Sequence, residues 1–144
     1  MTSHEKELPL GPPVTDITRS MPAAKRHEGH SVLLEPLAVK HVSGLWEAAQ
    51  SADSSWAYLR YGPFLSEDEL RAHVERIANL ADQPFFAIIP TSSGCPEGWA
   101  SFCDISPANA SIEIGSIWFS PRLQRTRAGT EAMFLMLSHA FELG

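Results

Sequence analysis

The sequence has little cysteine, little basic charge and no long apolar run. Its 144 residues include two cysteines, and 11 lysines and arginines stand against 17 acidic residues, for a formal charge of −6. No apolar run approaches the ~20 residues that a membrane-spanning helix needs. The acidic balance gives no general attraction for nucleic acid or anionic membranes. We therefore expect neither partner, and any anion site must come from a local cluster of basic residues.

The cysteines and histidines give no sign of a metal site. Cys95 and Cys103 match no metal-ligand spacing, and the first thirty residues lack the pattern of a secretory signal. We therefore expect two reduced thiols in a cytoplasmic protein. His41, His73 and His139 each lie alone on a predicted helix, where a surface or packing role is the usual one. No metal is expected.

Length and composition indicate one domain preceded by an arm. A chain of 144 residues with 44% hydrophobic residues can bury a sizeable core, since domains usually run to about 100–200 residues. Four prolines interrupt residues 1–30, and proline removes a backbone donor and fixes φ. This composition predicts an N-terminal arm over residues 1–30, without a helix or a central strand, and a domain over residues 31–144.

Apolar periodicity within residues 31–144 predicts a sheet flanked by helices. Ser66 and Glu69 form a capping box that opens the second helix. The last three strands are joined by short turns, which is typical of an antiparallel meander. The fold class is therefore α+β (α/β), with strands over 31–37, 85–89, 99–105 and 112–119 and helices over 41–52, 66–82 and 126–143.

Aromatic residues gather in the segment between the first two predicted helices. Trp56, Tyr58 and Tyr61 lie there, close to Gly62 and Pro63. Aromatic side chains in a loop must either pack on the core or line a binding site. Both interpretations remain open from the sequence.

Arg122, Arg125 and Arg127 lie within six residues, between a predicted strand and the last predicted helix. The first turn of a helix has N–H groups without intrahelical partners, and its dipole makes that end positive. Backbone donors and guanidinium groups together suit a pyrophosphate. The alternative is a solvated basic turn whose arginines pair with surface carboxylates such as Glu131.

The segment over residues 112–132 resembles the acetyl-CoA motif of the GNAT N-acyltransferase superfamily, most of all the branch that includes ribosomal-protein N-terminal acetyltransferases. The family's phosphate loop reads Gln or Arg, two residues, Gly, one residue, then Gly or Ala. Gln124 and Gly129 match the first and last positions, whereas Arg127 replaces the first glycine. The predicted order of elements over residues 31–144 is also similar to that family's. The resemblance implies a GNAT-like antiparallel meander sheet with flanking helices.

The resemblance also implies a reaction and a cofactor site. The reaction would transfer an acetyl group from acetyl-CoA, as co-substrate, to a primary amine such as a protein N-terminus or a small amine. Backbone groups of Trp118, Phe119 and Ser120 would hold the pantetheine. The pyrophosphate would be bound by the segment Gln124, Arg125, Thr126, Arg127, Ala128, Gly129 and Thr130.

The acceptor side carries further candidates under the same resemblance. Glu113 would act as general base, because a direct attack needs a neutral amine. The alternative for Glu113 is an ordinary solvent-facing carboxylate on a strand. Trp56, Tyr58 and Tyr61 would border the amine site, with core packing as the alternative.

In the family, a further strand, a further helix and a closing hairpin follow the pyrophosphate helix. Residues 31–144 therefore resemble only the N-terminal part of the family's domain. An uncovered strand edge invites pairing with another chain, so we expect self-association through the edge of the strand over 112–119. The alternative function is a non-catalytic cofactor-binding or protein-interaction module built on the same half-fold.

Overall fold

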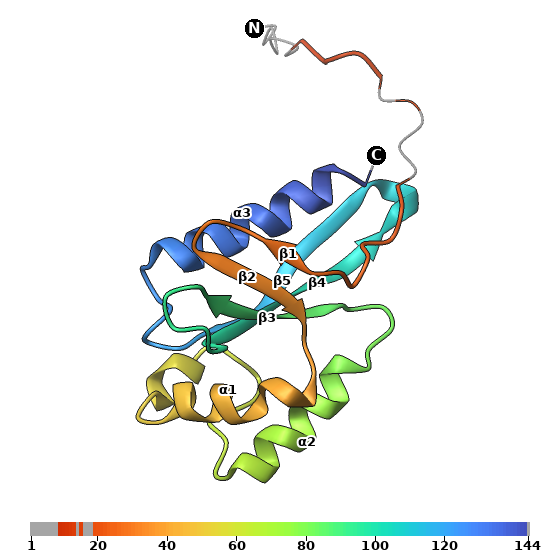
Figure 1. Cartoon of the computed structure of the whole chain (residues 1–144). Helices are drawn as coiled ribbons and strands as arrows, with labels where there is room; N and C mark the ends of the chain where they lie inside the picture. The colour runs from red at the N-terminus through yellow and green to blue at the C-terminus, as the bar shows by residue number, and fades with distance from the viewer. Residues whose placement is uncertain (1–8, 14, 16–18, 144) are drawn as a thin grey trace, which may run out of the picture.

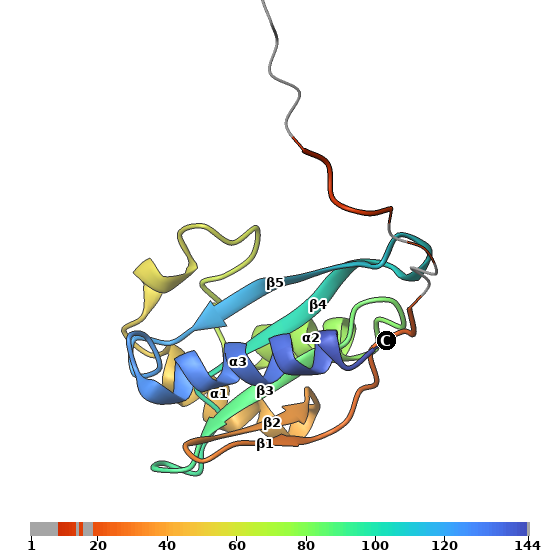
Figure 2. The same cartoon turned by 90° about the horizontal axis from the view of Figure 1, so that it is seen from above.

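The computed structural model describes residues 9–13, 15 and 19–143. Its centre is a five-stranded antiparallel sheet in which the strands follow one another in chain order. The strands are β1 (His27–Glu28), β2 (Val32–Pro36), β3 (Phe85–Pro90), β4 (Gly98–Ser106) and β5 (Ser111–Phe119). β1 and β5 form the two edges (Figure 2). The predicted meander is confirmed as β3–β4–β5.

Helices cover both faces of the sheet (Figure 1). α1 (Val42–Ala49) and α2 (Glu67–Ala78) lie on one face, and α3 (Arg127–Phe141) lies on the other. Ser66 is confirmed as the N-cap of α2, because its Oγ accepts from Glu69 N at 3.2 Å. The second bond of the predicted capping box is displaced by one residue, because Glu69 Oε2 accepts from Leu65 N at 2.9 Å rather than from Ser66 N. This arrangement is the predicted α+β class.

Several elements depart from the expected boundaries, and α2, expected to reach residue 82, ends at Ala78. The first predicted helix was expected to reach residue 52, but α1 ends at Ala49 because Ser51 has a φ of +56°, which no α-helix accommodates. A short 3₁₀ turn, η2 (Asp53–Trp56), follows instead. Within the predicted arm, β1 pairs with β2, so two residues before position 31 already belong to the sheet, at its edge.

The sheet separates two apolar cores. On the α1–α2 side the largest buried side chains are Trp56, Trp99 and Trp118. On the α3 side, Phe86, Phe102, Leu34, Leu123 and Met136 pack together. Both cores use side chains from β3, β4 and neighbouring elements, since successive strand residues point to opposite faces.

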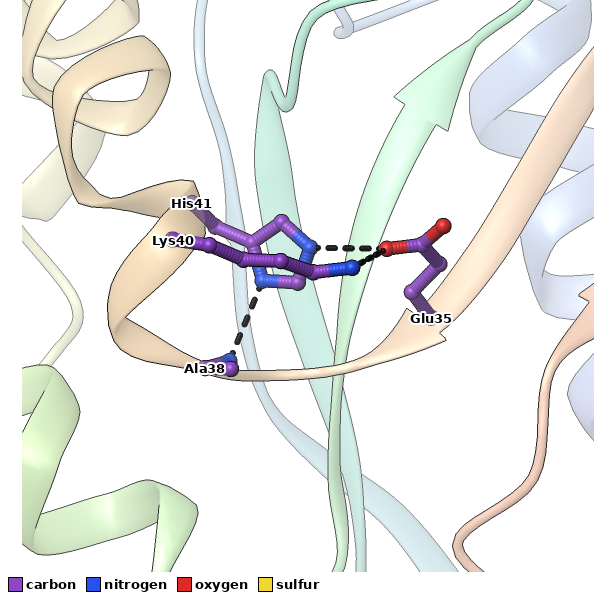
Figure 3. Close-up of polar contacts among 4 residues, drawn as sticks. All are labelled: Glu35, Ala38, Lys40 and His41. Atoms are coloured by element: carbon purple, nitrogen blue, oxygen red, sulfur yellow. Dashed lines mark hydrogen bonds and ion pairs between the residues drawn. The ribbon is translucent and has the colours of Figure 1, made fainter.

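A polar cluster fixes the chain where it leaves β2 and enters α1 (Figure 3). Glu35 Oε2 accepts from Lys40 Nζ at 2.6 Å and from His41 Nε2 at 3.0 Å. Because Ala38 N can only donate, its 3.0 Å contact makes His41 Nδ1 an acceptor and places the proton on Nε2. The hydrogen bonds from Lys40 and His41 lower the pKa of Glu35. His41 is buried and has a structural role, as the sequence predicted.

Candidate functional site

The connection from β5 to α3 folds back on itself through hydrogen bonds. Ser120 N donates to Glu97 O at 3.0 Å, and Ser120 O accepts from Leu123 N at 2.9 Å and Gln124 N at 3.1 Å. Gln124 Nε2 also donates to Phe119 O at 2.9 Å. Leu123 is fully buried in the core beneath α3. These contacts hold the first turn of α3 next to the end of β5.

Thr126 is the N-cap of α3. Its Oγ1 accepts from Gly129 N at 3.1 Å and donates to Leu123 O at 2.7 Å, while Thr130 N donates to Thr126 O at 3.2 Å. The amides of Gly129 and Thr130 therefore already have acceptors. Within the described residues, the amides of Arg127 and Ala128 have none, as expected for the first positions of a helix. The first two amides of α3 therefore have no acceptor in the described chain.

The three arginines near this helix start are exposed. Arg122, Arg125 and Arg127 make no ion pair within the part of the chain that the structure describes. Pairing with Glu131, the alternative considered from the sequence, is wrong. Glu131 instead accepts from His30 N at 2.8 Å and from Ser31 N and Oγ at 2.7 and 2.5 Å. Three guanidinium groups thus face solvent at the positive end of a helix.

Two backbone positions in the loop differ from what the family motif suggests. Arg127, in the place of the motif's first glycine, is the first residue of α3 and has no positive φ, so its side chain causes no backbone strain. Arg125 has a φ of +57°, a left-handed conformation that costs about 1–2 kcal/mol for a residue with a Cβ. The tight turn therefore lies two residues earlier than the missing glycine.

Gly129 allows close packing of α3. A Cβ at this position would lie 3.0 Å from Leu123 O and 3.1 Å from the ring of Phe119. Gly129 is itself buried. A glycine at this position could allow close approach of a ligand or close packing of the helix on the strand. The structure shows close packing of α3 on Phe119 and Leu123.

The end of β5 offers its backbone rather than its side chains. Trp118 is 1% exposed and Ser120 is fully buried, while Phe119 is half-buried against the α3-side core. Ser120 Oγ has no hydrogen-bond partner within the described residues. Because β5 is an edge strand, its outer side is not paired in the described sheet.

The predicted acceptor-side aromatics separate into two environments. Trp56 is 2% exposed, stacked on Trp118, and lies 6.2 Å from Tyr61 between ring centroids. Tyr61 is half-buried, and burial raises the pKa of its hydroxyl. Tyr58 is fully exposed. The structure thus brings Trp56 and Tyr61 into one aromatic cluster and leaves Tyr58 in solvent.

Glu113 lies on β5 opposite Cys103 of β4. It is six residues before Phe119, the end of β5 from which the arginine loop continues. Its carboxylate is exposed. Burial, and then the charge of Glu113, raise the pKa of the Cys103 thiol. Both cysteines are free thiols, as predicted. The catalytic role of Glu113 stays a prediction.

Two further polar residues, Gln83 and Ser101, contact the middle of β5. Gln83 Nε2 donates to Ser101 Oγ at 3.0 Å and to Ser116 Oγ at 3.1 Å. Neither residue carries a local signal in the sequence, because each reaches β5 from a distant segment.

Cavities also lie elsewhere on the described chain. A cavity of about 430 Å³ lies between the β4–β5 turn and the C-terminal end of α3, lined mainly by apolar side chains such as Ile105, Leu137 and Phe141. Among the described residues, no group of three or more His, Cys, Asp or Glu is arranged to hold a metal ion. No described helix is both long and apolar enough to span a bilayer.

Comparison of the sequence with models of known protein families gives a match over most of the chain. The model of the acetyltransferase (GNAT) domain matches residues 31–144. The chain belongs to the GNAT acetyltransferase family. A comparison with curated protein sequences finds no match.

Solved GNAT structures share the fold. A GCN5-related N-acetyltransferase from Brucella melitensis is 35% identical, with a TM-score of 0.84 over 88% of this chain and 59% of that chain. A probable GNAT-family acetyltransferase from Chromobacterium violaceum is 32% identical, with a TM-score of 0.83 over 95% of this chain and 70% of that one. This chain therefore spans about three fifths to seven tenths of their lengths.

The resemblance to ribosomal-protein acetyltransferases concerns the fold. A Salmonella typhimurium enzyme that modifies the N-terminal serine of ribosomal protein L7/L12 has a TM-score of 0.64 at 20% identity, over 81% of this chain and 67% of that one. The predicted GNAT-like sheet is confirmed by these comparisons.

Proposed function

We propose that this GNAT chain binds acetyl-CoA and transfers the acetyl group to a primary amine, either a protein N-terminus or a small amine. The supporting observation is the start of α3, where the amides of Arg127 and Ala128 have no partner in the described chain and three exposed guanidinium groups lie nearby. Backbone donors and arginines at a helix N-terminus suit a pyrophosphate. Gln124 and Thr126 would hold the loop in the shape that presents these donors.

The edge of β5 would hold the pantetheine. The backbone of Trp118, Phe119 and Ser120 leads directly to the loop, and the outer side of β5 is unpaired in the described sheet. An extended ligand can add to such an edge through backbone hydrogen bonds. The acetyl group would then lie farther along β5.

The acceptor amine must be neutral to attack the acetyl carbon. Its nitrogen would form the new C–N bond, the C–S bond would break so that coenzyme A leaves as its thiolate, and the nitrogen would lose one proton. Glu113 would take that proton, directly or through a water. Tyr58 and Tyr61, with Trp56 behind them, would border the amine.

The second candidate function is a non-catalytic module that binds acetyl-CoA or another chain. It is favoured by the open edge of β5 and by Phe134, Leu137 and Phe141 of α3, which are 49–85% exposed. Unpaired edges and apolar patches favour association, so we propose self-association through β5, in a cytoplasmic setting. Sedimentation at several concentrations tests this: a monomer at tens of micromolar would contradict it.

Calorimetric titration with acetyl-CoA tests the binding site. Replacing Arg122, Arg125 and Arg127 together by alanine should weaken binding at least tenfold, since a charge-assisted hydrogen bond contributes about 1.5–3 kcal/mol. The matched control R26A/R60A/R71A removes the same charge elsewhere and should bind as the parent does. Equal affinities for both triple variants would overturn the site. Turnover on a panel of amines then separates the enzyme from the binding module.

A further inference from the structure

β5 carries one residue more than β4 in its middle. Gly115 pairs with Ser101 and Trp118 pairs with Trp99, so three steps along β5 match two along β4. Ser116 lies inside this β-bulge with a φ of +50°. A residue with a side chain keeps such a conformation only where its surroundings hold it.

Two hydroxyl groups and one amide form a chain of hydrogen bonds at the bulge. The two protons of Gln83 Nε2 go to Ser101 Oγ at 3.0 Å and to Ser116 Oγ at 3.1 Å. The fully buried Ser101 then donates its own proton to Gly115 O at 3.0 Å. Each proton is used once, so the amide orientation of Gln83 fixes the direction of the whole chain of bonds.

Tyr61 adds two further hydrogen bonds to this network. Its hydroxyl donates to Ser116 O at 3.4 Å and accepts from Trp99 Nε1 at 3.2 Å. Ser101 and Tyr61 thus bind the carbonyl oxygens of Gly115 and Ser116, and Gln83 binds the Ser116 hydroxyl. A bulge held in this way fixes the direction in which the strand continues toward Trp118.

We propose that Gln83 is a positioning residue for the pantetheine of acetyl-CoA, acting through Ser101 and Ser116 on the course of β5. This inference rests on the cofactor site proposed above. The bulge directly precedes the backbone of Trp118, Phe119 and Ser120, which would bind the pantetheine. The pyrophosphate loop lies beyond Ser120 and is held by its own hydrogen bonds. Loss of the Gln83 amide therefore weakens binding of the pantetheine and leaves binding of the pyrophosphate unchanged.

Two ligands separate these parts. Acetyl-CoA has both the pantetheine and the diphosphate, whereas adenosine diphosphate has the diphosphate and lacks the pantetheine. For Q83L we expect at least a tenfold weaker affinity for acetyl-CoA and an affinity for adenosine diphosphate within twofold of the parent. The control is Q50L, because the side-chain amide of Gln50 also donates a hydrogen bond, to Trp46 O at 2.8 Å, but from an exposed position just after α1. Q50L should change neither affinity.

A second variant guards against a folding defect in Q83L. Q83E keeps the shape of the side chain but replaces the donor by an acceptor, which draws the Ser101 proton away from Gly115 O. Q83E should also bind acetyl-CoA more weakly and adenosine diphosphate as the parent does, while its melting temperature stays close to the parent's. Equal acetyl-CoA affinities for Q83L, Q83E and Q50L would overturn the inference alone. A parent chain that binds no acetyl-CoA would overturn the proposed function and this role with it.

Discussion

The indole rings of Trp56 and Trp118 are stacked, with centroids 4.2 Å apart and planes 9° apart. Trp56 comes from the 3₁₀ turn after α1, and Trp118 comes from β5. Trp118 Nε1 also donates to Ser55 Oγ at 2.9 Å. The aromatic segment is therefore fastened to the strand that leads to the arginine loop.

Replacing Trp56 by alanine should lower the stability of the protein. W56A should lower the free energy of unfolding by about 3–5 kcal/mol, the usual range for a buried aromatic replaced by alanine. Y58A, at an exposed position, should stay within about 0.5 kcal/mol of the parent. Urea denaturation measures both. Should Y58A instead raise the Michaelis constant for an amine at unchanged stability, Tyr58 borders the acceptor as the sequence predicted.

A methyl group at Gly98 should separate β4 from β5. An added Cβ would overlap the carbonyl oxygen of Trp118 and lie 2.9 Å from Leu123 Cδ2. G98A should therefore lower stability by about 1–3 kcal/mol, as overpacking does. G11A, which would meet no atom within 4 Å, is the control. A thermal melt in which G98A matches G11A would contradict the close approach of the two strands.

His73 should make the protein sensitive to mild acid. Burial, and then the charge of Arg76, lower the pKa of His73 from 6.5 to about 4. Between those pH values the unfolded chain binds the additional proton, so stability is present above pH 6.5 and falls as the pH decreases toward 4. The loss attributable to His73 should be about 2–3 kcal/mol.

The variant H73F should weaken this dependence, because a phenyl ring does not titrate and would still contact Tyr61 and Phe64. Some slope should remain, since burial also lowers the pKa values of His27 and His139. Unfolding measured from pH 7.5 to 4 gives the two slopes. Identical slopes for H73F and the parent would exclude His73 as the source.

Glu131 should matter in stronger acid. The hydroxyl of Ser31, followed by the amides of His30 and Ser31, lowers the pKa of Glu131 to about 2. Its contribution to stability is therefore complete above pH 4.5 and is lost as the pH falls toward 2. E131Q should be less stable than the parent at pH 7, and the difference should disappear near pH 2. E75Q, at an exposed position of α2, is the control and should show no such convergence.

Local sequence signals were sufficient for the regular elements but not for contacts between distant segments. Ser66 and Glu69 predicted the start of α2 because both partners of the cap lie within one turn. Proximity in sequence suggests Glu131 as a partner for the arginines. Its carboxylate instead accepts hydrogen bonds from Ser31, which lies 100 positions away in the chain. Gln83 likewise has no local sequence signal, because Ser101 and Ser116 lie 18 and 33 positions away in the chain.

The bond between Glu131 and Ser31 also bears on the order in which the protein folds as it is made. The two residues are 100 positions apart in the chain. At about 5–20 residues per second, a ribosome needs roughly 5–20 s to synthesise the intervening segment. Until then the amides of His30 and Ser31 have no carboxylate to bind and remain hydrogen-bonded to water. The β1–β2 corner is secured only after the nascent chain has completed the first turns of α3.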